Sequence, residues 1–311
     1  MAKRVKSVVN DDGVVRYPAT QDRFGARPVD PNTPLAEMPV HTYGHVGLIA
    51  VYGSDELIVQ AARTSYGKGT EAVRDVKTLI RYLLRQKHTS PFEQAELTFY
   101  LRLPIFVMRQ LIRHRTANVN EYSARYSELS DDFYVPGPTY LGKQSTTNKQ
   151  GRSDSADFTD AELASITNEM VTAQEDAVRA YHRMLDMGVS RELARVPTTV
   201  GMYTECYWKI DLHNFFHMLR LRLDPHAQKE IVDFAQAMYD CAKPYFVDAF
   251  QAFEDYVRNA YTLSALEIAM LTDVLSDFRA ELRSTGWPTN TYGMSKREYS
   301  DFSHFLDTLV K

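Results

Sequence analysis

Arginines gather in one short stretch of the chain, between residues 102 and 125. Their guanidinium groups are planar forks of N–H donors, which match phosphates and carboxylates and stack on flat rings. Glu121 is the only acid there, so five arginines against one glutamate leave a local charge of +4 in a chain whose net charge is -4. The stretch indicates an anion-binding site, although it also suits a solvated helix end that complements the helix dipole. Its basic residues are Arg102, Arg109, Arg113, Arg115 and Arg125, with His114 among them.

A second cluster combines three histidines with acids and arginines. His213 and His217 are one helical turn apart, so they share a face of the expected helix. Together with His226 and an aspartate they suggest a metal site, and with it a metal-dependent nucleotide phosphohydrolase as an alternative function. Histidines at this density more often hydrogen-bond or stack than bind metal, so we expect no metal here. The cluster comprises Asp211, His213, His217, Arg220, Arg222, Asp224 and His226.

Motifs that hold phosphates or metals through a fixed spacing are missing from the sequence. No Gly-x-Gly-x-x-Gly follows an expected strand, and no Gly-x-x-x-x-Gly-Lys-Ser/Thr loop occurs. There is no His-Glu-x-x-His motif, and Cys206 and Cys241 are too few to fill a tetrahedral zinc site. Any bound dinucleotide must therefore be held by side chains and not by a glycine-rich loop.

The elements that must position these clusters follow from hydrophobic periodicity. Alternation with period two predicts strands over 95–101 and 202–210. Strands and helices mix without regular alternation, which predicts an α+β fold with a mixed sheet packed against long helices. Apolar spacings of three and four predict helices over 71–86, from Pro104 to about residue 113, over 163–184, after Asp211, and from Asp224-Pro225 through 238.

The two ends of the chain differ in character. Residues 1–40 contain many prolines and little periodicity, so we expect an irregular N-terminal arm. Residues 256–311 are expected to be a helical C-terminal extension, with capping boxes at Ser264/Glu267 and Ser295/Glu298. The polar stretch 143–153 has no apolar period and is expected to be a mobile surface loop.

The composition is that of a globular protein, 44% hydrophobic and 24% charged, which excludes a disordered chain. A negative net charge argues against a polycation that wraps nucleic acid. No run of about 18 apolar residues is available to span a bilayer, and no apolar segment follows the charges at the N-terminus. We therefore expect a cytoplasmic protein with neither nucleic acid nor membrane as a partner.

Three motifs, in the right order, resemble those of the flavin-dependent thymidylate synthase family. The first is Arg113-His114-Arg115, followed after seven residues by Ser123, with the extension NEYSARYS over 120–127. The sequence HTSPFE at 88–93 lies upstream of it, and LRLDPHAQ at 221–228 lies downstream. The resemblance implies that residues 41–255 form the catalytic domain.

Such a resemblance implies conversion of dUMP to dTMP in nucleotide biosynthesis. The one-carbon donor would be 5,10-methylenetetrahydrofolate, and NADPH would supply reducing equivalents through FAD. In a cofactor enzyme of this kind the protein mainly supplies orientation and electrostatics. The family fold also implies a homotetramer of α+β subunits whose active sites lie between subunits.

The resemblance assigns site residues as well. Arg222 is implied to be catalytic, because a guanidinium that keeps its proton can stabilise a uracil ring that has lost the proton of N3. Residues implied to bind dUMP are Gln110, Leu111, Ile112, Arg113, Glu121, Tyr122, Ser123, Ala124, Arg125, Arg195 and Arg222. Residues implied to bind FAD are His88, Ser90, Arg113, His114, Arg115, Glu121, Asp211, Leu212, His213 and His217.

Nucleophilic mechanisms and a binding role fit the sequence less well. A thiolate mechanism requires an exposed, electropositive cysteine, whereas Cys206 lies on an expected strand and Cys241 on an amphipathic helix. Ser123 has no base defined by the sequence, which favours it as a dUMP contact. A non-catalytic nucleic-acid-binding module is a further alternative, but the basic stretch is short and no stacking motif of an RNA-binding fold occurs.

Overall fold

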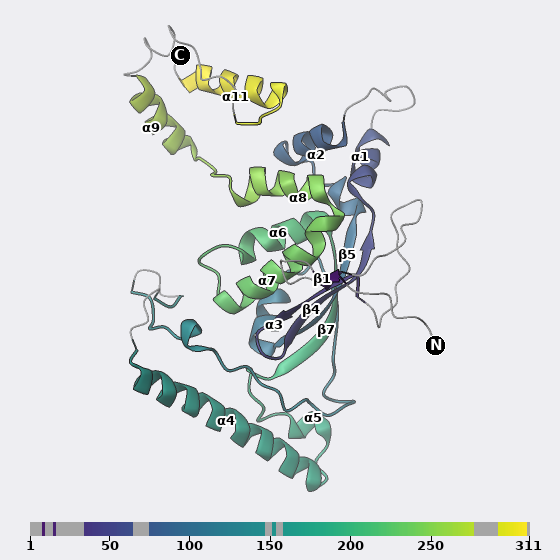
Figure 1. Ribbon diagram of the computed structural model, residues 1–311, viewed down its shortest axis with the longest axis vertical. Coiled ribbons are helices and arrows are strands. Elements are labelled where there is room, and N and C mark those ends of the chain that lie inside the picture. The colour runs from purple at the N-terminus through teal and green to yellow at the C-terminus, as the bar shows by residue number, and fades with distance from the viewer. Residues whose placement is uncertain are drawn as a thin grey trace. The chain divides into compact units, whose positions relative to one another are not determined.

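The computed structural model describes residues 8–9, 15–16, 34–64, 75–146, 151–153, 158–276 and 292–309. The chain divides into two compact units, Met1–Phe253 and Glu254–Lys311, which are described one after the other. The first unit carries the sheet and the residues of both clusters (Figure 1).

One sheet organises the first unit. Among the described residues its strands follow the order β1-β2-β3-β4-β5-β7-β6. Each of the described pairings is antiparallel, and not mixed as expected. The cause is connectivity, because a tight turn joins β3 to β4 and the long excursion after β5 returns the chain in the opposite direction as β7. The bounds are β1 Val8–Val9, β2 Val15–Arg16, β3 Ala36–Val40, β4 Gly44–Tyr52, β5 Glu96–Pro104, β6 Asn118–Glu121 and β7 Tyr203–Asp211.

Residues 36–40, expected to belong to an irregular arm, form strand β3 instead. The whole strand pairs with β4, from Ala36 opposite Leu48 to Val40 opposite Gly44. The prolines nearby obscure the strand pattern in the sequence. The strand forms because β4 supplies its hydrogen-bond partners. The α+β class itself is confirmed.

The two alternating segments form strands, as predicted, and the structure shows that these strands are neighbours in the sheet. The segment 95–101 lies in β5 and the segment 202–210 in β7. Phe99 of β5 is fully buried opposite Trp208 of β7, and its ring stacks on that of Phe215 with centroids 5.5 Å apart. Burying each such side chain stabilises the fold by about 1.5–3 kcal/mol. This apolar face is where the helix bearing the second cluster packs.

Helices α3, α6 and α7 contact strands of the sheet, and the helices expected from periodicity are confirmed. The predicted helix 71–86 is described from Val76 onward, since 71–74 lie outside the described residues. The helix after Pro104 ends at Leu111, two residues earlier than expected. The bounds are α1 Asp55–Arg63, α2 Val76–Arg85, α3 Ile105–Leu111, α4 Asp160–Asp186, α5 Arg191–Ala194, α6 Leu212–Arg222, α7 Lys229–Ala242 and α8 Val247–Phe253.

One predicted helix start is wrong. The helix expected from Asp224-Pro225 begins at Lys229, with Gln228 as its N-cap. The Asp224 carboxylate instead accepts a hydrogen bond from the backbone N–H of His226 at 2.8 Å, which closes a turn. Asp211, in contrast, caps α6 as expected and accepts from the backbone N–H of Asn214 at 2.9 Å. Aspartate makes similar local hydrogen bonds in turns and in caps, so the pattern alone does not separate the two.

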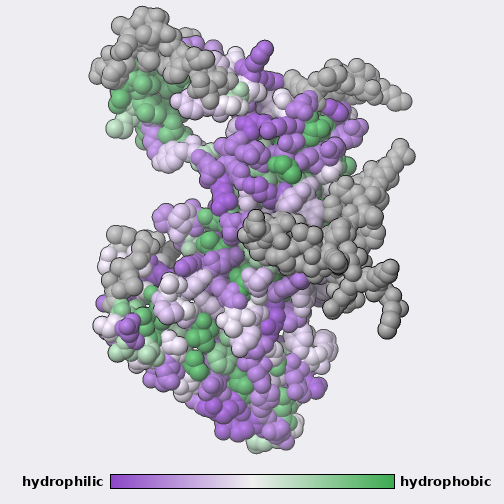
Figure 2. Space-filling view, in the orientation of Figure 1, coloured by the Kyte–Doolittle hydropathy of each residue, from purple (hydrophilic) through white to green (hydrophobic). Residues whose placement is uncertain are grey.

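The described part of the second unit is helical, as predicted. It contains a π-helical turn at Glu254–Arg258, then α9 Ala265–Ser276 and α11 Lys296–Leu309. Both expected capping boxes form; the backbone N–H groups of Ser264 and Ser295 donate to Glu267 and Glu298 at 2.7 and 2.6 Å. Figure 2 shows apolar side chains gathered over α9, where Leu266 is 83% exposed. Among the described residues, no helix combines the length and apolar character needed to cross a membrane.

Candidate active site

The turn that follows α3 determines how the arginine stretch is presented. The backbone N–H of His114 donates to the carbonyl of Leu111 at 3.0 Å, and that of Ala117 donates to the carbonyl of His114 at 3.2 Å. These bonds direct His114 inward, where it is 8% exposed, and leave Arg113 and Arg115 exposed on either side. Two neighbouring guanidinium groups therefore face solvent around one buried imidazole.

His114 joins the arginine stretch to the second cluster. Arg222, the last residue of α6, donates from Nε to His114 Nε2 at 3.0 Å and from Nη2 to the carbonyl of Gln110 at 3.1 Å. Burial lowers the pKa of His114 to about 4, with further contributions from Arg222 and His217. The imidazole is therefore neutral at pH 7, which lets its Nε2 accept the bond from Arg222.

No acid in the described part of the chain compensates the charge of Arg222. Among the described residues, neither of its hydrogen bonds goes to a carboxylate. Partial burial lowers its pKa, and the nearby charge of Arg113 adds to this effect. A half-buried guanidinium beside a second cation favours an anion or a ring that carries delocalised negative charge.

Gln110 extends this group of residues, and its partner was not identified from the sequence. Gln110 Nε2 donates to Gln228 Oε1 at 2.6 Å. Gln228 is the last residue of the LRLDPHAQ motif, but the motif does not indicate its partner. Only the packing of α7 against α3 reveals the pairing with Gln110. Leu111 is buried in the core and Ile112 is 46% exposed, so of these two only Ile112 has an accessible side chain.

Residues 121–125 are anchored along the edge of the sheet. Glu121, in edge strand β6, accepts from the hydroxyl of Thr204 at 2.8 Å. The backbone N–H of Tyr122 donates to the carbonyl of Glu205 at 2.7 Å, and its hydroxyl donates to the carbonyl of Glu128 at 2.6 Å. These contacts fix the strand that leads into Ser123, which is half-buried.

Ser123, Ala124 and Arg125 form the turn that ends this segment. The backbone N–H of Arg125 approaches Ser123 Oγ at 3.4 Å, and Ala124 is buried. Arg125 forms an exposed ion pair with Glu192 of α5, with 3.4 Å between Nε and Oε2. Arg195 follows at the C-cap of α5 and is also exposed. The structure thus places two of the predicted dUMP-binding arginines beside the same short helix.

Two of the predicted FAD-binding residues, His88 and Ser90, make no contact with His114 or Arg222 among the described residues. Both are exposed on the segment after α2, and the ring of His88 stacks on Tyr82 with centroids 6.0 Å apart. Within the described residues, no hydrogen bond, ion pair or ring contact joins either of them to His114 or Arg222. One subunit therefore does not bring all the predicted FAD-binding residues into mutual contact.

The remaining predicted FAD-binding residues lie at the start of α6. Both carboxylate oxygens of Asp211 accept from Asn214, one from its backbone and one from its side chain at 2.7 Å. Leu212 is fully buried, whereas His213 is half-buried. His217 is exposed, and its ring approaches that of His114 with centroids 6.4 Å apart.

The alternative metal site is not supported. His226 hydrogen-bonds through Nδ1 to its neighbour Asp224 at 2.9 Å, whereas His217 contacts His114. In the part of the chain that the structure describes, no three His, Cys, Asp or Glu side chains come together as metal ligands. The metal-dependent phosphohydrolase hypothesis therefore loses its basis.

Comparisons with known proteins agree with these motifs. Residues 47–246 match the family model of the thymidylate synthase complementing proteins. The chain is 47% identical over 244 residues to the flavin-dependent thymidylate synthase of Treponema denticola, covering 77% of this chain and 90% of the relative. It is 45% identical over 274 residues to that of Dictyostelium discoideum, covering 86% and 85%.

A solved structure supports the same relationship. A UMP/dUMP methylase from Streptomyces cacaoi, bound with 5-Br dUMP, is 34% identical and superposes with a TM-score of 0.62. The match covers 71% of this chain and 99% of that one. The agreement of family model, sequence relatives and fold leads to one conclusion. The chain belongs to the flavin-dependent thymidylate synthase family.

Proposed function

We propose that this protein converts dUMP to dTMP by reductive methylation. The one-carbon unit would come from 5,10-methylenetetrahydrofolate and the reducing equivalents from NADPH through FAD. Family membership supports the reaction, and the dUMP analogue bound to the related methylase supports the substrate. The observation on this chain that carries the proposal is the uncompensated charge of Arg222, held by His114 and Gln110.

Arg222 supplies the electrostatic part of the reaction. Removing the proton from N3 of uracil spreads negative charge over the ring, and a preorganised cation lowers the free energy of that state. The two hydrogen bonds to His114 and Gln110 hold the guanidinium in one orientation, so no reorganisation is needed as the charge develops. Gln110, with Ile112, Ser123 and the backbone of Leu111, would position the base and sugar.

The phosphate of dUMP requires cations that are free to bind it. Arg113 is exposed and has no carboxylate within ion-pair distance among the described residues, so its fork is available. Arg125 and Arg195, beside α5, would complete the phosphate site. The segment 121–125 would be held in place mainly by Glu121 and Tyr122, because both are hydrogen-bonded to residues of β7. Ala124 would contribute through its backbone.

The chemistry of the donor set fits FAD. A pyrophosphate requires cations and N–H donors, which the exposed Arg113 and Arg115 supply, and the neutral His114 is suited to a flat ring system. When bound, FAD supplies the hydride-transfer and one-carbon chemistry. His88, Ser90, Glu121, His213 and His217 would add polar contacts. Asp211 and Leu212 would act mainly through their backbone, since the carboxylate caps α6 and the leucine side chain is buried.

The separation of these residues in one chain favours a site completed by another subunit. We therefore propose a homotetramer, with His88 and Ser90 of one subunit approaching the Arg222 group of another. Residues 41–255 would form the catalytic part and 256–311 a helical extension that lies outside the matched family region. We further propose that the protein acts in the cytoplasm, on small molecules, without nucleic-acid or membrane partners.

An absorption experiment tests the proposal. The purified protein is titrated with FAD and then treated with NADPH under anaerobic conditions, with and without dUMP. We expect a bound-flavin spectrum that bleaches with NADPH, faster when dUMP is present, and dTMP formation once methylenetetrahydrofolate is added. A protein that neither binds FAD nor oxidises NADPH would overturn the assignment.

A further inference from the structure

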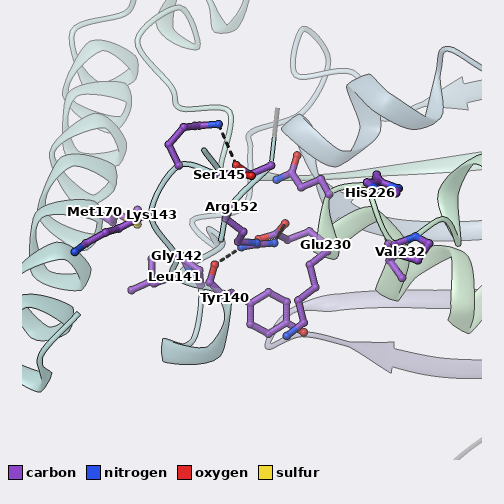
Figure 3. A pocket seen from close by; sticks show the side chains of 17 residues that line it. Tyr140, Leu141, Gly142, Lys143, Ser145, Arg152, Met170, His226, Glu230 and Val232 are labelled. Atoms are coloured by element: carbon purple, nitrogen blue, oxygen red, sulfur yellow. Dashed lines mark hydrogen bonds and ion pairs between the residues drawn. The ribbon is translucent and has the colours of Figure 1, made fainter. Parts of the chain in front are cut away.

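A cavity of about 930 Å³ lies next to the proposed active site and is not explained by the predicted site residues. It is bounded by residues 140–145 and 151–152, by the start of α7 and by Met170 of α4 (Figure 3). Its volume falls within the range of cofactor and substrate sites, which is about 300–1,000 Å³. The polar stretch 143–153, which no motif of the family resemblance includes, contributes part of the wall through Lys143, Gln144, Ser145, Gly151 and Arg152.

An internal hydrogen-bond network links residues in the wall of this cavity. The Glu230 side chain is only 4% exposed; it pairs with Arg152, with 2.9 Å between Oε2 and Nη2, and accepts from the Tyr134 hydroxyl at 3.1 Å. Arg152 also donates to the carbonyl of Tyr140. Figure 3 shows Arg152 lying between Tyr140 and Glu230 in the cavity wall. The charge of Arg152 is thus neutralised by Glu230, and the pair serves as a support.

Two further cations in the wall form no ion pair with a described residue. Lys229 lies over the ring of Tyr140, with Nζ 4.2 Å from the centroid, and Lys143 lies 5.5 Å from the ring centroid of Phe158. Among the described residues, no carboxylate lies within ion-pair distance of either ammonium group. Among the residues that line the cavity, Glu230 is matched to Arg152, so the lining keeps the charges of the two lysines; Asp233 near Lys229 and Glu162 near Lys143 lie outside the lining. Such a lining favours a phosphate or carboxylate.

A short hydrogen-bonded path connects the cavity with the proposed reaction site. Gln228 lines the cavity and accepts from Gln110 at 2.6 Å. The carbonyl of Gln110 in turn accepts from Arg222 at 3.1 Å. A ligand in the cavity would therefore be separated from a substrate at Arg222 only by Gln228 and Gln110.

We propose that this cavity binds the anionic end of a co-substrate of the reaction, through Lys143 and Lys229. The inference rests on the proposed function, which requires two large anionic co-substrates besides dUMP. The shared chemistry is a phosphate or carboxylate group: the 2′-phosphate of NADPH or the glutamate carboxylates of the folate. The phosphate of dUMP is assigned to the arginines, so the cavity is left for one of these two.

Binding to the FAD-loaded, dUMP-bound protein tests the inference by calorimetry. Lys143→Ala and Lys229→Ala are suitable variants, because both side chains are exposed and their loss leaves no buried group unpaired. The ligands are NADP⁺, NAD⁺ as its analogue without the 2′-phosphate, and tetrahydrofolate carrying one or several glutamates. We expect each substitution to raise the Kd of one of the two co-substrates about tenfold, and the Kd of dUMP to stay unchanged.

The pattern of losses identifies the occupant. If the variants bind NADP⁺ more weakly but keep the Kd of NAD⁺, the 2′-phosphate lies in the cavity. If instead the loss of folate affinity grows with the number of glutamates, the folate tail lies there. Lys77→Ala, an exposed lysine of α2, is the matched control and should change neither Kd. If both lysine variants bind NADP⁺ and folate like wild type, the inference is overturned.

Failure of this inference is distinguishable from failure of the proposed function. A wild-type protein that forms dTMP, together with lysine variants that keep both affinities, refutes the cavity assignment alone. A wild-type protein that binds the co-substrates but forms no dTMP refutes the proposed function. In that case the lysine variants still report whether the cavity holds an anion.

Discussion

Arg222 Nε donates a hydrogen bond to His114 Nε2 at 3.0 Å, which joins two residues 108 positions apart in the chain. His114 lies in the turn after α3, and Arg222 is the last residue of α6. The bond unites the two clusters of basic residues that the sequence displays separately. It also explains why a buried histidine stands between two exposed arginines, since the neutral imidazole is the acceptor that orients the guanidinium.

Replacing Arg222 with alanine should lower the rate of dTMP formation by about 10²–10³-fold, the usual cost of losing one preorganised charged donor. The fold should persist, because Arg222 lies at a helix end and not in the core. Single-turnover formation of dTMP measures the effect, and circular dichroism checks the fold. Arg220→Ala, an exposed arginine on the same helix, is the control and should retain turnover. Normal dTMP formation by the Arg222 variant would contradict the role.

The depressed pKa of His114 predicts a pH dependence of stability. Its pKa is about 4 in the folded protein and about 6.5 when unfolded, so between these values the unfolded state binds a proton that the folded state does not. This contribution to the free energy of unfolding is therefore present above pH 6.5 and is lost as the pH falls toward 4. His114→Gln keeps an acceptor for Arg222 but does not titrate.

Urea denaturation at pH 7 and pH 5 measures this effect. Wild type should lose more free energy of unfolding between the two pH values than His114→Gln does. His304→Gln, an exposed histidine of α11, serves as the control and should follow wild type. Equal pH slopes for wild type and His114→Gln would show that His114 titrates alike in both states.

Replacing Arg125 with alanine should weaken dUMP binding by about tenfold or more, because a charge-assisted contact to the phosphate is lost. Stability should change by less than about 1 kcal/mol, since its ion pair with Glu192 is exposed. Equilibrium binding of dUMP and thermal unfolding separate the two effects. Arg179→Ala, which removes exposed ion pairs within α4, is the control. An unchanged dUMP affinity in the Arg125 variant would remove it from the phosphate site.

Cys206→Ala should retain dTMP formation. Burial raises the pKa of the Cys206 thiol to about 12, with a smaller contribution from Glu121, so a thiolate is not populated at pH 7. The thiol is 2% exposed and contacts Met108, so the substitution should lower the free energy of unfolding by about 1 kcal/mol. Activity and urea denaturation of the variant check both statements. Loss of turnover in a folded variant would revive a cysteine mechanism.

Local signals in the sequence predicted much of the fold. Alternation in 95–101 and 202–210 revealed β5 and β7, and Asp211, Ser264 and Ser295 marked helix starts, because strand faces and caps depend on neighbours within a few residues. Strand β3 was missed, since its hydrogen-bond partners lie in β4. The start of α7 was misplaced because Asp224 makes a turn with the same kind of local bond as a cap.

The sequence by itself determined the family, through three motifs whose residue types and order are specific, and it marked Arg113, His114 and Arg222 as candidates for the site. Only the tertiary structure decided how these residues act together. The pairing of His114 with Arg222, the bond between Gln110 and Gln228, and the cavity lined by Lys229 all arise where distant segments pack. Their energies depend on burial and on distances between groups far apart in the chain, which no local pattern encodes.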